Sequence, residues 1–249
     1  MTEIDARHKI LGHPTSVPFG VSPMAMYKLV DLIGEVCAAK PCADKNIPFC
    51  LSLASNCSLE EVSHSAQYPK EKLIFLALYM FYDDQIISDI IRRAELSGFK
   101  GFVITVDRPY EGKREENLRT PFHLDPSATL GNLAKYWGQN GEKPVEILKR
   151  LKDNIRTDLV WENILALRAR TKLPIILKGI QTPQDTILAR ELGVDAVWIS
   201  NHGGRTMDSL KPNLEILESC RLALTKHDTK FNIWNWVPFM YLQFIPKNF

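Results

Sequence analysis

Residues 173–205 read LPIILKGIQTPQDTILARELGVDAVWISNHGGR, and this stretch decides the fold. Ile175–Lys178 and Ala196–Ser200 are short, mainly apolar runs with β-branched residues, which favours buried strands. Between them, Thr182–Leu192 carries the signals of a helix: a threonine able to cap it, a proline in its first turn, and Gly193 just after its end. A strand, a helix and a second strand in this order are typical of a parallel sheet with helices packed on it.

The same alternation continues towards the N-terminus. It predicts four more strands, at Val17–Ser22, Phe49–Leu53, Leu73–Tyr79 and Phe102–Val106, and two more helices, at Ile86–Leu96 and Trp161–Ala169. Residues 124–151 are the least regular part of the chain, and we expect a long loop there. The fold class is therefore α/β, either a barrel or a doubly wound sheet.

Length and composition set limits on the function. The chain has 249 residues, enough for one large α/β domain spanning residues 1–249. A net charge of +2 is too small to indicate nucleic acid or an anionic membrane as a partner. Five cysteines without a CxxC pair indicate a reduced, intracellular protein without a metal site. No signal peptide is evident at the N-terminus.

Polar side chains gather where the predicted strands end. They are Tyr79, Thr105, Asp107, Lys178, His202 and Arg205. Taken singly, each has an ordinary explanation, since a lysine at a strand end is usually solvated and an aspartate usually caps a turn. In a parallel barrel, however, these ends meet on one face, where they supply a base, a carboxylate, a hydroxyl and cations. That set suits an anionic substrate. No GxGxxG or Walker sequence is present, so a Rossmann dinucleotide site and a P-loop are unsupported.

The motif Ser200–Arg205 (SNHGGR), with Asp208 three residues later, resembles the FMN-dependent α-hydroxy acid oxidases and dehydrogenases, such as glycolate oxidase and long-chain hydroxy acid oxidase. Further similar segments are Pro23–Met26, Ser58–Val62, Gly98–Glu115 and Leu173–Gly179. The resemblance runs from about Ile10 to about Leu224 and implies a (β/α)8 TIM barrel that binds FMN at the carboxyl ends of its strands.

The resemblance also implies roles for individual residues. The catalytic residues would be His202 as base, Asp107 beside it and Tyr79 near the reacting carbon. The substrate would be bound by Arg114, Arg205, Tyr79 and His202, because a guanidinium offers a bidentate fork to a carboxylate. FMN would be bound by Pro23, Met24, Ala25, Ser52, Thr105 and Lys178, with the lysine stabilising the reduced, anionic ring.

Four departures from the family pattern set further expectations. Ala77 stands where the family has a flavin-binding glutamine, and Ala54 replaces a pocket aromatic, which suggests a wider pocket. The chain starts after the segment that carries a substrate-binding tyrosine. The family's phosphate-binding Asp-Gly-Gly and Gly-Arg sequences are not found, and residues 231–249 form an aromatic-rich tail outside the family pattern. We therefore expect an incomplete barrel, with strands one to six clear, a degenerate seventh and no eighth.

The implied function is FMN-dependent oxidation of a small 2-hydroxy acid to a 2-oxo acid, with oxygen as the favoured acceptor and hydrogen peroxide as product. The alternative is an inactive paralogue or splice form that binds or modulates full-length subunits. A third reading, another FMN barrel such as an isomerase, is disfavoured by the SNHGGR motif. Family resemblance suggests a homo-tetramer or co-assembly, and a peroxisomal location. Because the last residues are not an SKL-type signal, a cytoplasmic location is the other expectation. Prolines and amides in the tail argue against a membrane anchor.

Overall fold

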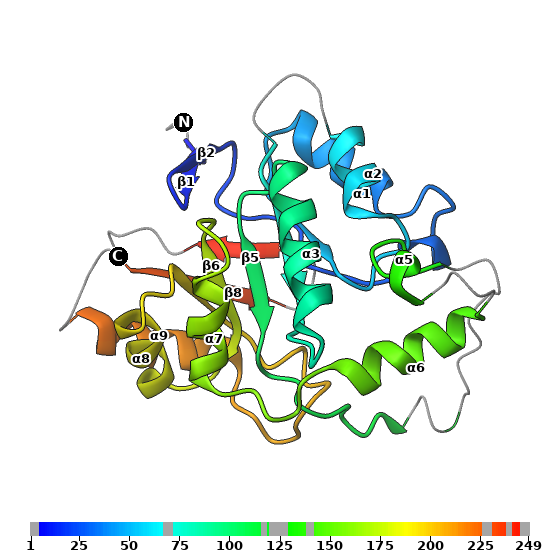
Figure 1. Ribbon diagram of the computed structural model, residues 1–249. Coiled ribbons are helices and arrows are strands. Elements are labelled where there is room, and N and C mark those ends of the chain that lie inside the picture. The colour runs from blue at the N-terminus through cyan, green and yellow to red at the C-terminus, as the bar shows by residue number, and fades with distance from the viewer. Residues whose placement is uncertain are drawn as a thin grey trace.

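A single seven-stranded sheet organises the molecule (Figure 1). The computed structural model describes residues 5–66, 72–115, 119, 129–137, 142–225, 231–237 and 241–244. The strands follow one another in chain order: β3 (Phe49–Ser52), β4 (Ile74–Leu78), β5 (Phe102–Thr105), β6 (Ile175–Ile180), β7 (Ala196–Ile199), β8 (Asn232–Val237) and β9 (Tyr241–Phe244). All neighbours pair in parallel except β8 and β9. The carboxyl ends of six strands therefore lie on one side.

Helices connect the strands and cover the outer face of the sheet. They are η1 (Tyr27–Leu29), α1 (Val36–Asp44), α2 (Leu59–Ser65), α3 (Asp84–Leu96), α5 (Ala134–Trp137), α6 (Pro144–Asn154), α7 (Trp161–Arg168), α8 (Pro183–Glu191) and α9 (Asn213–Thr225). Helix α3 shows why they form where they do. The Asp83 carboxylate caps its start by accepting hydrogen bonds from the N–H groups of Gln85 and Ile86, and isoleucines at helical spacing form its buried face.

Two apolar clusters lie on the two faces of the sheet. The inner cluster fills the barrel and contains Cys50, Phe75, Ala77, Val103, Ile176, Ala196, Trp198 and Trp234, together with Ile10 and Leu73. The outer cluster lies between the strands and the helices. Ile10 belongs to an N-terminal hairpin, β1 (His8–Ile10) and β2 (His13–Thr15), at the amino end of the strands, opposite to the tip of the β5 arrow in Figure 1. The hairpin therefore closes the floor of the barrel, and the carboxyl ends form the open rim.

The predicted strands Phe49–Leu53, Leu73–Tyr79, Phe102–Val106, Ile175–Lys178 and Ala196–Ser200 are confirmed, each end within two residues of the observed one. The helices Ile86–Leu96, Trp161–Ala169 and Thr182–Leu192 are confirmed with the same accuracy. Thr182 caps α8 as expected, because its hydroxyl accepts a hydrogen bond from Asp185 N at 3.1 Å.

Two predictions of local structure are wrong. Val17–Ser22 does not form a strand: it contributes one parallel bridge, between Val21 and Phe49. Pro18 within it has no N–H to donate, so a longer ladder is disfavoured. The long loop expected at 124–151 contains α5 and the start of α6 within its described residues. Ile147 and Leu151, one helical turn apart, bury the face that the irregular composition concealed.

The seventh strand, expected to be degenerate, is present as β8. It pairs in parallel with β7 from Ala196–Asn232 to Ile199–Asn235, and its Trp234 is fully buried in the inner cluster. The strand that follows, β9, turns back and pairs antiparallel with β8. Among the described strands the pairing runs in one line from β3 to β9. The fold is thus the expected α/β barrel in incomplete form.

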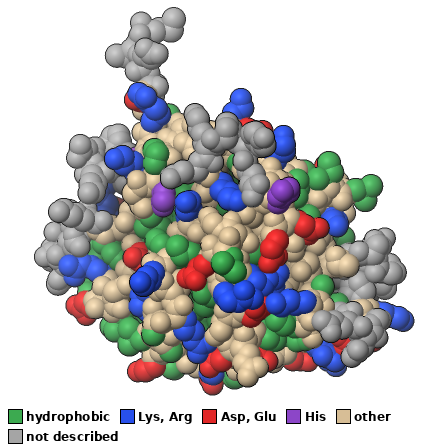
Figure 2. Space-filling model, turned by 45° about the horizontal axis from the view of Figure 1, so that its top comes forward, with side chains coloured by type: hydrophobic (Ala, Val, Ile, Leu, Met, Phe, Trp, Pro, Cys, Tyr) green, Lys and Arg blue, Asp and Glu red, His purple; other side chains and the backbone are tan. Residues whose placement is uncertain are grey.

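The surface is mixed in character. On the face shown in Figure 2, acidic and basic side chains are interspersed rather than gathered into a patch of one sign. Within the described part of the chain, no helix is both long and apolar enough to cross a membrane.

Candidate active site

The closest pair of catalytic candidates is His202 and Asp107. Asp107 follows β5 and His202 follows β7, and the rim of the barrel brings His202 Nδ1 to 2.9 Å from Asp107 Oδ1. The side chain of Asp107 is 6% exposed and that of His202 is 20% exposed. Burial lowers the pKa of His202, the hydrogen bond to Asp107 opposes this, and the charge of Lys178 lowers the pKa further. The ring is therefore neutral at neutral pH and keeps Nε2 available as a base.

The backbone is specialised at this pair. His202 has a left-handed φ of 56°, and its N–H donates to the Ser200 hydroxyl at 3.0 Å. Such a conformation is uncommon for a residue other than glycine and is held here by the turn. On the next strand, Gly179 has a φ of +114°, and a Cβ atom there would lie 2.5 Å from Asp107 Cβ. Only glycine fits beside the aspartate in this backbone.

Lys178 is buried beside the same pair. Its side chain is 8% exposed, and its Nζ lies 3.7 Å from Asp107 Oδ2 and 3.5 Å from His202 Nδ1. Burial lowers the pKa of Lys178, while Asp107 and Cys50 act in the opposite direction. Asp107 Oδ2 has no hydrogen-bond partner. The ammonium has three donors and only long contacts in the described structure, so it has capacity to bind an anionic group.

The arginines form a second group around Tyr79. Arg108 Nη1 lies 3.4 Å from the Tyr79 hydroxyl, and its guanidinium carbon is 5.7 Å from the centre of the ring. Burial lowers the pKa of Arg114, and the charges of Arg205 and Arg108 lower it further. Arg114 Nε is buried without a hydrogen-bond partner. Three guanidinium groups therefore lie close together at the rim, one with an unused donor.

Two loops meet to assemble the arginines. Gly112, between Arg108 and Arg114, lies so close to the loop after β7 that a Cβ atom would be 2.3 Å from the Arg205 carbonyl oxygen. The side chain of Arg205 is exposed, whereas that of Arg114 is 20% exposed. The predicted pair Arg114 and Arg205 is thus brought together across this contact.

The residues expected to bind the flavin lie around the same rim. Pro23, Met24 and Ala25 follow the bridge at Val21, with Met24 46% exposed. Ser52 ends β3 and accepts a hydrogen bond from Ala54 N, and Thr105 ends β5 opposite Lys178 on β6. Ser22 Oγ, next to Pro23, is buried without a partner. In the described residues no group of three His, Cys, Asp or Glu side chains is placed to hold a metal.

Two buried polar residues that support the rim were missed by the sequence reasoning. Glu35 is fully buried, and its carboxylate accepts hydrogen bonds from the N–H groups of Tyr27, Asn56 and Cys57. Asn132, also fully buried, accepts from Leu59 N and donates to the Ser52 and Leu53 carbonyls. The only sequence signal was a Gly-Glu and a Gly-Asn pair, which is too common to be informative.

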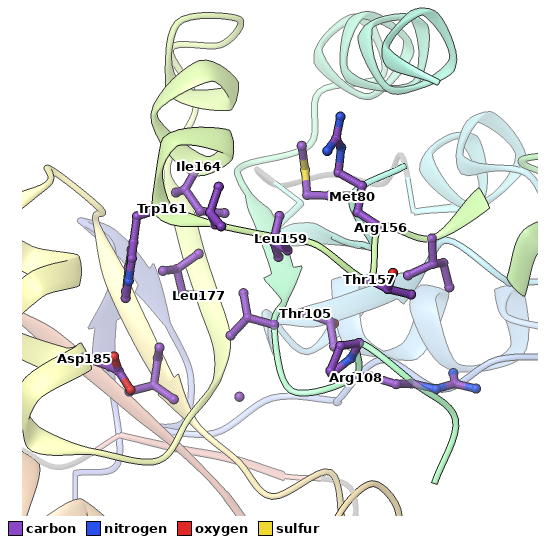
Figure 3. Close-up of a pocket in the computed structure, with 16 residues that line it drawn as sticks. Met80, Thr105, Arg108, Arg156, Thr157, Leu159, Trp161, Ile164, Leu177 and Asp185 are labelled. Carbon is purple, nitrogen blue, oxygen red and sulfur yellow. The ribbon is translucent and has the colours of Figure 1, made fainter. Parts of the chain in front are cut away.

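A cavity of about 420 Å³ lies beside the rim, on the outer face of β5 and β6 (Figure 3). Apolar side chains such as Leu159, Ile164 and Leu177 line it. Arg108 also belongs to its wall, but in Figure 3 its guanidinium extends away from these apolar side chains. Neither His202 nor Asp107 lines this cavity, so it is separate from the catalytic pair, although Arg108 in its wall directly follows Asp107.

Comparisons with known proteins identify the family of the chain. Residues 1–233 match the family described as FMN-dependent dehydrogenase. The peroxisomal (S)-2-hydroxyacid oxidase GLO4 of Arabidopsis thaliana is 34% identical over 88% of this chain and 59% of its own length. The L-lactate dehydrogenase (cytochrome) of Saccharomyces cerevisiae is 34% identical over 92% of this chain and 38% of its own length.

Among solved structures, mandelate oxidase with (S)-4-hydroxymandelic acid superposes with a TM-score of 0.83 at 28% identity, over 96% of this chain and 65% of that one. The chain spans less than two thirds of the length of each of these relatives. The family match nevertheless covers most of the chain, and the chain belongs to the FMN-dependent dehydrogenase family.

Proposed function

We propose that this chain carries the catalytic rim of an FMN-dependent 2-hydroxy acid oxidase. The observation that carries the proposal is the buried His202–Asp107 pair, 2.9 Å apart, with Lys178 beside it and an unused Arg114 donor nearby. The net reaction converts a 2-hydroxy acid and oxygen into a 2-oxo acid and hydrogen peroxide. Oxygen is favoured because several relatives are named oxidases, although the yeast relative is a cytochrome-linked dehydrogenase.

The residues present fit an FMN ring. Lys178 Nζ and Ser22 Oγ are buried polar groups, and neither has a short hydrogen bond within the described residues. Such groups carry a free-energy cost unless a ligand pairs with them. Lys178, Ser22 and Thr105, with the backbone at Pro23–Ala25, are the groups that would hold the ring. When bound, FMN supplies the acceptor for the two electrons that the substrate loses.

The proton chemistry follows from the hydrogen bond to Asp107. If Nδ1 of His202 donates to Asp107, Nε2 has a free lone pair and accepts the proton that the substrate releases. The imidazolium that results lies against the Asp107 carboxylate, which stabilises it. Arg114 and Arg205 would hold the substrate carboxylate, and the Tyr79 hydroxyl would bind near the reacting carbon.

The experiment that tests this is the flavin absorbance of the purified chain after incubation with FMN, followed by anaerobic addition of a 2-hydroxy acid. We expect bound yellow flavin that bleaches, and a His202→Ala variant that binds FMN but no longer bleaches. A protein that takes up no FMN would contradict the proposal and favour the alternative, an inactive chain that binds full-length subunits.

The name of the Arabidopsis relative also supports a peroxisomal location for the proposed reaction.

A further inference from the structure

Arg108 adds a third guanidinium to a site in which two are expected to bind the substrate carboxylate. It directly follows Asp107, yet its side chain reaches the Tyr79 hydroxyl at 3.4 Å and is only 19% exposed. Its charge acts on both Arg114 and His202. Arg108 therefore lies near Tyr79 and Arg114, two of the residues expected to surround the substrate, and its charge reaches His202.

The carboxylate that Arg108 contacts is heavily shared. Among the described residues, Glu111 pairs with Arg108 at 3.3 Å, with Arg114 at 3.9 Å and with Lys152 of α6 at 2.7 Å. One negative charge thus serves three positive side chains, and the shortest contact belongs to Lys152. The distances to Arg108 and Arg114 exceed those of a good charge-assisted hydrogen bond.

The group formed by Arg108, Arg114, Arg205 and Glu111 keeps a net positive charge when a substrate with one carboxylate binds. A single substrate carboxylate between Arg114 and Arg205 would use the donors that are now unpaired, including Arg114 Nε. It would leave Arg108 with its long contacts to Glu111 and Tyr79. A mostly buried cation whose donors make only long contacts favours a second anionic group at that position.

We propose that Arg108 is a specificity-determining residue that selects 2-hydroxy acids bearing a second carboxylate on their side chain. This inference rests on the proposed function, because it concerns the substrate class of the same site. The second carboxylate would lie beside Tyr79 and accept hydrogen bonds from Arg108. Because Arg108 donates a hydrogen bond to the phenol oxygen, the O–H group of Tyr79 would stay available to donate a hydrogen bond to the substrate.

The test compares two substrates that differ only at the far end of the molecule. 2-Hydroxyglutarate and 2-hydroxypentanoate have the same five-carbon chain, with a carboxylate in one and a methyl group in the other. With the FMN-loaded chain we expect kcat/KM to favour 2-hydroxyglutarate about tenfold or more, the effect of one good charge-assisted hydrogen bond. Arg108→Met should remove that preference, because it should lower kcat/KM for 2-hydroxyglutarate about tenfold more than kcat/KM for 2-hydroxypentanoate.

Two further variants separate recognition from folding. Lys113→Met removes one positive charge from the same loop at a side chain that is 76% exposed, and it should leave the preference unchanged. Arg108→Lys keeps the charge without the planar fork and should restore part of the preference. An equal loss on both substrates in Arg108→Met, or no preference in the unaltered chain, would overturn the inference.

A binding measurement keeps the inference distinct from the proposed function. Calorimetry with 2-oxoglutarate and 2-oxopentanoate, on the chain with and without FMN, should show tighter binding of 2-oxoglutarate that depends on Arg108. If neither hydroxy acid is turned over, the proposed function fails, and the calorimetry alone decides the inference. Equal affinities for the two oxo acids would reject it.

Discussion

At the scale of the residue, His202 shows how burial and a neighbouring carboxylate set the state of a base. Burial and the charge of Lys178 lower the pKa of His202 from its ordinary 6.5 more than Asp107 raises it. We expect a titration midpoint below 6.5, measured by NMR on histidine-labelled protein without substrate. A midpoint above 6.5 would show that Asp107 dominates instead.

The same shift has a consequence for stability. Because the folded pKa of His202 is depressed, the unfolded chain binds more protons than the folded chain between the two pKa values. The contribution of His202 is therefore complete above about pH 6.5 and is lost as the pH falls through the folded pKa. Acid conditions would weaken both the fold and the base through one group.

Gly179 provides a second prediction at this scale. In Gly179→Ala the new methyl group would meet Asp107 Cβ at 2.5 Å in a left-handed backbone, so we expect a loss of about 2–5 kcal/mol in the free energy of unfolding. Gly193→Ala is the matched control, since its φ is +78° but nothing lies within 4 Å of the added atom. It should cost about 1–2 kcal/mol from the backbone alone.

Urea unfolding gives the free energy of unfolding of both glycine variants. The NMR signal of His202 shows whether its surroundings have changed. We expect that signal to shift in Gly179→Ala, where Asp107 must move, and to stay in place in Gly193→Ala. Equal costs and unchanged signals in the two variants would mean that the backbone conformation matters and the contact with Asp107 does not.

At the scale of the element, the sequence was most informative where an apolar run ends in clear punctuation. The unit β6–α8–β7 combines β-branched strands with Thr182 as cap and Gly193 as stop, and each signal acts locally. Helix α6 was missed although Pro144 stands at its first turn and Glu146 accepts from Lys143 N. Its apolar face is short, so the sequence pattern alone does not indicate a helix. The structure shows this face packed into the outer cluster.

In the candidate site, too, features with a local sequence signal could be predicted and features that depend on packing could not. The residues at strand ends could be predicted because parallel strands bring their carboxyl ends together. Glu35 and Arg108 could not, because their roles depend on where loops cross. Glu35 joins the start of η1 to the loop after β3 through three backbone N–H groups, and this contact spans 21 residues between Glu35 and Asn56. The proposed role of Arg108 depends on Gly112, which lets the loop of Arg108 approach the loop of Arg205.

At the scale of the whole molecule, the incomplete barrel predicts an uneven distribution of stability. β5 and β6 have a paired strand on each side, whereas β9 pairs with β8 alone among the described strands. A strand at the edge of a sheet opens without disturbing the rest. Amide hydrogen exchange should therefore be slowest in Phe102–Thr105 and Ile175–Ile180, close to the limit set by global unfolding.

In the same experiment β9 should exchange faster than β6, by about a hundredfold or more if its local opening costs at least about 3 kcal/mol less than global unfolding. β7 provides the internal reference. It pairs with a strand on each side and carries the buried Trp198. Equal protection of β9 and β7 would mean that another strand or a second subunit covers the edge in solution. Sedimentation of the same sample would then separate these two cases, because only a second subunit doubles the mass.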